Sequence, residues 1–243
     1  MANLTPNAAR RAGYALHVLT ASGAVIGMLA LQGVVDGEVR IALLWLIVSQ
    51  ILDGLDGPIA RGLDVEIHAP LINGQILDLV VDYVTCVVVP VAFMLNFEML
   101  PPKYEALIAG FIFLTSALWF ARSDIETEDH WFNGFPAVWN LAVPTFLVFG
   151  STPTEVAIFT MILGMSQLTY FKVPHIVRVV QLRRITFPFG VIYLGNLTYL
   201  SWNYSETLGV QSNIVSEIIL IAFPVYLLGF GIYKTWSTRG IRE

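Results

Sequence analysis

Four aspartates stand out because they lie inside apolar stretches at spacings of three and four residues. Asp53 and Asp56 form one pair, and Asp78 and Asp82 form the other. In a helix these spacings place both members of a pair on one face. A charged side chain in a membrane-spanning helix costs about 2.5–3.5 kcal/mol on insertion scales, so a functional role is its default explanation.

The chemistry that these residues suit is metal binding. Four carboxylates in a medium of low dielectric repel one another unless cations compensate their charge. Two divalent ions would balance the four negative charges, and hard cations such as Mg²⁺ prefer carboxylate oxygens. The sequence therefore predicts a two-metal centre with Asp53, Asp56, Asp78 and Asp82 as ligands. Hydrogen bonds between helices and a cation-conducting path are the alternatives.

Small residues accompany both aspartate pairs. Gly57 and Ala60 lie on the same helical side as the first pair, and Gly74 lies one turn before Asp78. Small side chains leave a concave surface that a bulky ligand can approach, although close helix packing uses the same pattern. Arg61 is suited to bind a phosphate group or to anchor the cytoplasmic end of its helix.

The elements that position these residues are expected to be membrane helices. Of the 243 residues, 56% are hydrophobic and 13% are charged, against about 25% charged in soluble domains. This composition excludes an ordinary cytosolic enzyme, a disordered chain and a disulfide scaffold; Cys86 is the single cysteine. The net charge of −5 argues against nucleic acid as a partner.

Apolar runs of about 20 residues are needed to cross a bilayer, and eight candidates are present. We expect an all-α polytopic membrane protein with eight transmembrane helices, forming a single domain over residues 1–243. The expected spans cover residues 15–35, 39–60, 75–96, 104–121, 134–150, 153–172, 187–203 and 213–236.

Lysine and arginine are distributed unequally between the expected loops. Eleven lie on the side of the N-terminus, whereas only Arg40 and Lys103 lie on the opposite side. Because positive charge is enriched in cytoplasmic loops, both termini are expected in the cytoplasm. The eleven residues are Arg10, Arg11, Arg61, Arg122, Lys172, Arg178, Arg183, Arg184, Lys234, Arg239 and Arg242.

The runs DGLDGPIAR and NGQILDLVVD resemble the signature of the CDP-alcohol phosphotransferases. That signature is D-x-x-D-G-x-x-A-R, followed after a spacer by G-x-x-x-D-x-x-x-D. The spacer between Arg61 and Gly74 has twelve residues, more than most members have. The matching positions are Asp53, Asp56, Gly57, Ala60, Arg61, Gly74, Asp78 and Asp82.

Similarity in LDLVVDYVT, FNGFPAVWN and VPHIVRVV indicates the bacterial family members that make phosphatidylcholine. The resemblance implies transfer of a phosphatidyl group from CDP-diacylglycerol to choline, with release of CMP and dependence on Mg²⁺ or Mn²⁺. It also implies a six-helix catalytic core followed by two C-terminal helices, a bacterial inner-membrane location with the active site facing the cytoplasm, and a homodimer.

Residue roles follow from the same resemblance. Asp53, Asp56 and Asp78 would ligate metal. Asp82 would act as the general base, while also touching the second metal. The cytidine diphosphate part of the donor would be held by Gly57, Ala60, Arg61 and Gly74.

A choline site needs aromatic faces and negative charge, because a quaternary ammonium donates no hydrogen bond. The segment 124–135 supplies both, although the same composition is typical of a solvated acidic loop with interfacial aromatics. The candidate residues are Tyr83, Asp124, Glu126, Glu128, Asp129, Trp131, Phe132 and Phe135.

Two kinds of alternative remain at this point. One is a phosphotransferase for serine, inositol phosphate or glycerol phosphate. A phosphorylated acceptor would need several basic residues, whereas the nearby loops offer mainly Arg61 and Arg122, which favours an acceptor without phosphate. The other is a cation transporter, in which inverted repeats are common; here the buried charge is confined to one helix pair.

Overall fold

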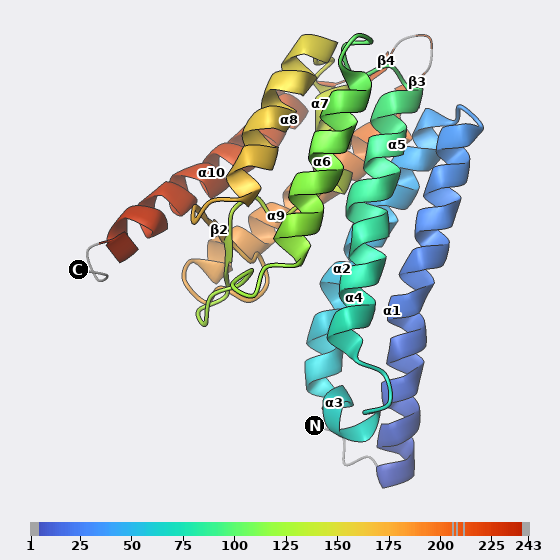
Figure 1. Ribbon diagram of the computed structural model, residues 1–243, viewed down its shortest axis with the longest axis vertical. Coiled ribbons are helices and arrows are strands. Elements are labelled where there is room, and N and C mark those ends of the chain that lie inside the picture. The colour runs from blue at the N-terminus through green and yellow to red at the C-terminus, as the bar shows by residue number, and fades with distance from the viewer. Residues whose placement is uncertain (1–4, 206, 208, 211, 240–243) are drawn as a thin grey trace.

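The computed structural model describes residues 5–205, 207, 209–210 and 212–239, so Arg242 of the positive-charge count lies outside it. Most described residues are helical (Figure 1). A π-helical turn, η1 (Tyr83–Val88), joins α4 to α5. The helices are α1 (Pro6–Val35), α2 (Val39–Gly62), α3 (Val65–His68), α4 (Gly74–Asp82), α5 (Val89–Asn96), α6 (Glu105–Phe120), α7 (Trp139–Val148), α8 (Pro153–Gln167), α9 (Arg183–Trp202) and α10 (Ile214–Arg239).

A described helix overlaps each of the eight expected apolar runs. Three described segments are long and apolar enough to cross a membrane, namely Pro6–Val35, Gly74–Asn96 and Ile214–Ser237. The second of these is the continuous run of α4, η1 and α5. Shorter apolar helices cover Glu105–Phe120 and Trp139–Val148. These helices indicate a multi-pass membrane protein.

Short strands are an addition to the expected all-α fold. β1 (Trp131–Asn133) pairs antiparallel with β2 (Lys172–Pro174), and β3 (Tyr204–Ser205) pairs with β4 (Gly209–Val210). The first pair changes two expected boundaries. The run 153–172 is helical only to Gln167 because the chain then enters β2.

The expected span 134–150 likewise begins late, at Trp139. The preceding residues cannot continue a helix: Gly134 and Ala137 have positive φ angles of 82° and 54°, and Pro136 lacks a backbone donor. The loop after β1 therefore leads directly into the N-terminus of α7.

The helices that carry the aspartates stand side by side with α1 (Figure 1). Glycines allow α1 to approach closely. A Cβ at Gly23 would lie 2.6 Å from the Cγ1 atom of Val81, and one at Gly27 would lie 3.2 Å from the Cγ2 atom of Thr85. Close packing at small residues is typical of membrane helices, and here it fixes α1 against the helix that carries Asp78 and Asp82.

The helix geometry changes immediately after Asp82, where η1 begins. Pro90 has no N–H to donate to the carbonyl of Cys86, and Thr85 Oγ1 donates to the carbonyl oxygen of Val81 at 3.1 Å. Both features disturb regular α-helical bonding along this segment. π-helical turns inside α-helices are frequent at functional sites.

Candidate active site

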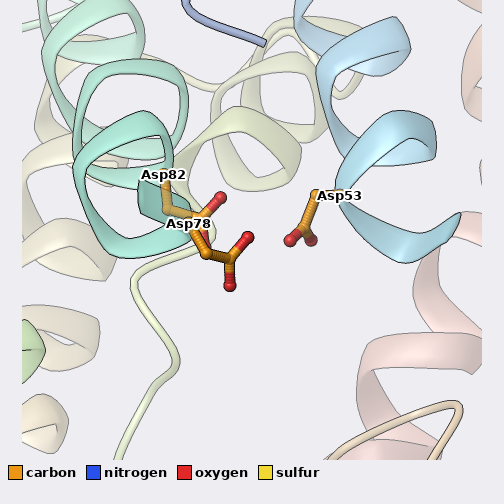
Figure 2. Close-up of side chains that lie close together, drawn as sticks. All are labelled: Asp53, Asp78 and Asp82. Atoms are coloured by element: carbon orange, nitrogen blue, oxygen red, sulfur yellow. The ribbon is translucent and has the colours of Figure 1, made fainter. Parts of the chain in front are cut away.

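Three of the four aspartates meet between α2 and α4. Asp53 projects from α2 towards Asp78 and Asp82 on α4 (Figure 2). One carboxylate oxygen from each residue lies within 4.8 Å of the other two, and all three side chains are partly buried. Asp53, Asp78 and Asp82 are called the Asp group below.

Asp56 belongs to the same pocket but is held differently. Its side chain is 7% exposed, and its Oδ2 atom accepts a hydrogen bond from Thr20 Oγ1 of α1 at 2.8 Å. The pocket is lined by Thr20, Gly23, Ser49, Leu52, Asp53, Asp56, Asp78, Val81, Asp82 and Thr85. The four predicted ligands therefore line one pocket. The carboxylates of Asp53, Asp78 and Asp82 are close enough to one another to bind a single ion.

The donor set fits a hard divalent cation. No ion pair with lysine, arginine or histidine involves these four aspartates within the described part of the chain. Their hydrogen-bond donors are neutral groups, Gln50 for Asp53 and Thr20 for Asp56. Clustered carboxylates without a cationic side chain leave charge compensation to bound cations.

The predicted donor-binding residues do not line this pocket. A Cβ at Gly57 would lie 3.3 Å from Arg61 Nη1, so the glycine leaves room for the guanidinium beside α2. Ala60 packs against Leu16 and Val65 of α1 and α3. Its contacts are those of helix packing.

The long spacer before α4 is folded onto α1. It contains the short helix α3, and His17 Nε2 lies 3.3 Å from the carbonyl oxygen of Ala69. A Cβ at Gly74 would lie 3.2 Å from His17 Cε1. Gly74 thus gives His17 the space to hold the spacer, and the sequence alone offered no role for this histidine.

Arg61 has basic neighbours that are distant in sequence. Arg178, Arg183 and the acidic Glu126 lie close enough to Arg61 to interact with it electrostatically. This differs from the expectation that the nearby loops offer mainly Arg61 and Arg122, because the segment after β2 folds back towards α2. Arginine guanidinium groups match the geometry of phosphate oxygens, so this cluster suits an anionic part of a substrate.

His175 borders this cluster as a neutral ring. Its ring stacks on Phe132, with the ring centroids 5.3 Å apart and 20° between the planes. Burial, together with the neighbouring Arg178 and Arg61, lowers the pKa of His175 to about 4. The imidazole is therefore uncharged at neutral pH and adds no further positive charge beside Arg61.

Acidic residues of the segment 124–135 already have cationic partners. Asp124 Oδ1 lies 2.8 Å from Arg122 Nε, and that hydrogen bond lowers the pKa of the Asp124 carboxyl. Glu126 pairs with Arg178 at 2.7 Å and with His130 at 2.8 Å.

Trp131 and Tyr83, two of the aromatic candidates, also have partners within the chain. Lys234 pairs with Asp129 at 2.5 Å, and its Nζ atom lies 5.5 Å from the centroid of the Trp131 ring. Outside the segment, the hydroxyl of Tyr83 donates to the carbonyl oxygen of Phe113 at 3.2 Å. These contacts are those of a surface loop that ion pairs and hydrogen bonds hold in place.

Two residues in contact with the aspartates were missed in the sequence. Gln50 is one turn before Asp53 and donates to its Oδ2 atom at 3.0 Å. A glutamine in an apolar run, one turn from an aspartate, is a signal in the sequence that could have indicated a hydrogen bond to that aspartate. Thr20 had no comparable signal, because its partner Asp56 lies in another helix.

Comparison with known proteins supplies the family. A sequence profile described as CDP-alcohol phosphatidyltransferase matches residues 15–179. A phosphatidylcholine synthase of Bradyrhizobium diazoefficiens is 36% identical over 92% of this chain and 84% of its own length.

Other relatives agree with this match. A phosphatidylcholine synthase of Borreliella burgdorferi is 32% identical over 92% of this chain and 94% of its own length. One from Pseudomonas aeruginosa is 34% identical over 74% of this chain and 76% of its own length. The profile covers α2 and α4, the helices that carry the Asp group. The chain therefore belongs to the CDP-alcohol phosphatidyltransferase family.

Proposed function

We propose that this chain transfers the phosphatidyl group of CDP-diacylglycerol to the hydroxyl of choline and releases CMP. The observation that carries the proposal is the similarity to phosphatidylcholine synthases over most of the chain. The pocket with its four aspartates supports a phosphoryl-transfer reaction, because a diphosphate must be neutralised before an alcohol can attack it.

The Asp group and Asp56 would hold the divalent cations on which this family depends. Such ions neutralise diphosphate oxygens and stabilise the attacking and leaving oxygens of the displacement. Mg²⁺ and Mn²⁺ both suit all-carboxylate sites. In this assignment Asp53, Asp56 and Asp78 are ligands, and Asp82 is both a ligand and a reacting group.

Asp82 acts as the general base of the reaction. Its carboxylate takes the proton of the choline hydroxyl as that oxygen attacks the phosphorus atom bearing the diacylglycerol. A new bond forms between choline oxygen and phosphorus, and the bond from phosphorus to the CMP oxygen breaks. The proton then leaves Asp82 to solvent, which restores the carboxylate for the next turnover.

The donor headgroup lies on the Arg61 side of the pocket. Arg61 contacts a phosphate, and Arg183 adds positive charge there, whereas Arg178 is paired with Glu126. Gly57, Ala60 and Gly74 add no bulky side chain of their own to this side of α2 and α4. Their present contacts with Arg61, with α1 and α3, and with His17 position the backbone that the nucleotide approaches.

The proposed topology has eight spans, with both termini in the cytoplasm of a bacterial inner membrane and the active site on that side. The positive-charge bias of the loops supports this arrangement. The family profile ends at residue 179, before α9 and α10. That boundary supports a six-helix catalytic core with two C-terminal helices, and the family resemblance adds a homodimer.

The acceptor can be tested directly with purified protein in detergent. CDP-diacylglycerol and Mn²⁺ are supplied with choline, serine, inositol phosphate or glycerol phosphate, and CMP and the lipid product are measured. We expect CMP release that depends on choline and yields phosphatidylcholine. Release with another alcohol alone would replace choline as the acceptor, and no release with any alcohol would contradict the reaction. The Asp82→Asn variant serves as the inactive control.

A further inference from the structure

A pair of side-chain amides connects α7 to the metal-binding side chain Asp53. Asn140 Nδ2 donates to Gln50 Oε1 at 3.1 Å, and Gln50 Nε2 donates to Asp53 Oδ2 at 3.0 Å. Asn140 and Gln50 are called the amide pair below. Because they are 90 residues apart in sequence, this contact exists only in the folded chain.

The direction of the two bonds is set by Asp53. A carboxylate accepts hydrogen bonds, so Gln50 must present its NH₂ group to Asp53 and its carbonyl oxygen to the opposite side. That oxygen needs a donor, and Asn140 supplies one with its own NH₂ group. The amide of Asn140 therefore fixes the orientation of Gln50, and through it one oxygen of Asp53.

Asn140 is poorly explained by folding alone. It is fully buried, and its Oδ1 atom has no hydrogen-bond partner within the described part of the chain. A buried amide with an unsatisfied oxygen costs about 1–3 kcal/mol. An apolar side chain of similar size would avoid that cost, so the contribution of Asn140 must come from the donor that it directs at Gln50.

We propose that Asn140 and Gln50 are positioning residues that hold the Asp53 carboxylate in the orientation required to bind the divalent cation. Neither residue belongs to the aspartate signature. Partners behind a metal ligand orient it and tune its affinity, and their loss typically costs about 10–100-fold in metal affinity or activity. The inference rests on the proposed function, because it concerns the metal of that reaction.

The test compares Asn140→Leu, Gln50→Leu and the double variant with the control Gln167→Leu. Gln167 is also fully buried, donates from Nε2 to Ser116 Oγ at 3.3 Å, and has an unpartnered Oε1 atom among the described residues. In the described part of the chain, Gln167 makes no hydrogen bond to Gln50, Asn140 or the four aspartates. The control thus removes a similar amide without touching Asp53.

Three quantities are measured on purified protein: Mn²⁺ binding by electron paramagnetic resonance, the thermal midpoint, and CMP release against Mn²⁺ concentration. For Asn140→Leu and Gln50→Leu we expect Mn²⁺ affinity to fall by about tenfold or more. The thermal midpoint of Asn140→Leu should change little, because the loss of the unsatisfied Asn140 Oδ1 atom offsets the loss of the donor to Gln50 Oε1. The double variant should lose no more affinity than Gln50→Leu, because residues in one hydrogen-bonded series are not additive.

The opposite results would overturn the inference. Unchanged Mn²⁺ affinity in Gln50→Leu would show that the amide pair has no role in metal binding. Gln50 is the less buried of the two positions, so this result can be obtained even if Asn140→Leu fails to fold. An affinity loss in Gln167→Leu equal to that in Asn140→Leu would indicate a general packing effect. Wild-type protein that binds Mn²⁺ without transferring to any alcohol would contradict the proposed function and leave the amide-pair test intact.

Discussion

Two groups of acidic side chains differ in how their charge is compensated. In the segment 124–135, Asp124, Glu126 and Asp129 each lie within 2.8 Å of an arginine, lysine or histidine nitrogen. In the pocket between α2 and α4, Asp53 accepts a hydrogen bond from Gln50 and Asp56 accepts one from Thr20. No cationic side chain pairs with any of the four aspartates in the described part of the chain.

This difference separates a structural use of charge from a functional one. In the surface segment, the charges of Asp124, Glu126 and Asp129 are compensated within the chain, so these carboxylates need no ligand. The pocket places four carboxylates where desolvation is costly and leaves their charge to be balanced from outside. Removal of that external charge should therefore affect the pocket far more than the segment.

The largest expected effect is that of metal removal. Chelation with EDTA followed by gel filtration should abolish CMP release, because the diphosphate and the aspartates would then repel one another. Addition of Mg²⁺ or Mn²⁺ should restore it, whereas Ca²⁺, which prefers more ligands at longer distances, should restore it less. Full activity in metal-free protein would show that the pocket is neutralised in some other way.

Asp82→Asn should lower turnover by about 10²–10⁴-fold, the usual range for loss of a general base. Asparagine keeps the size of the side chain but takes no proton from the attacking hydroxyl. CMP release at saturating donor and Mn²⁺ measures the chemical step, and donor binding is measured separately.

Asp53→Asn is the matched variant for that experiment. Asp53 is a proposed ligand without a proton-transfer role, so its loss should weaken Mn²⁺ and donor binding more than Asp82→Asn does. Equal losses of affinity in both variants, with turnover recovering at high Mn²⁺, would make Asp82 a ligand only.

The sequence predicted the clustering of the four aspartates better than it predicted the residues around them. Spacings of three and four residues within one helix are local, so the shared faces of Asp53 with Asp56, and of Asp78 with Asp82, followed from the helical period. The short connection between the two helices made it reasonable to expect the faces to meet. The positions of the apolar helices followed from composition in the same way.

Contacts between distant segments could not be predicted. Asn140 reaches Gln50, and Arg178 lies near Arg61, only because α7 and the segment after β2 pack beside α2. The β1–β2 pair was also missed, since three-residue strands carry no periodic pattern long enough to detect. Such features depend on tertiary packing, which the spacing of residues in one helix does not encode.

Close packing of α1 against the Asp group gives the next prediction. Gly23→Ala places a Cβ 2.6 Å from Val81 Cγ1, and overpacking of this kind costs about 1–3 kcal/mol. We expect a lower thermal midpoint and weaker Mn²⁺ binding, because Val81 immediately precedes Asp82. In Gly110→Ala the added Cβ meets no described atom within 4 Å, so that control should be neutral. Equal effects in both variants would exclude a specific contact.

The smallest effect is expected in the paired segment, where Asp129→Asn breaks the ion pair with Lys234. Asp129 is 53% exposed in its side chain, and exposed ion pairs contribute about 1 kcal/mol or less. Lys234 keeps its position 5.5 Å from the Trp131 ring, so the aromatic face stays covered by a cation of the chain itself. The KM for choline should therefore change little. A rise of about tenfold, equivalent to about 1.4 kcal/mol, would instead place Asp129 in the choline site and remove the distinction between the two groups.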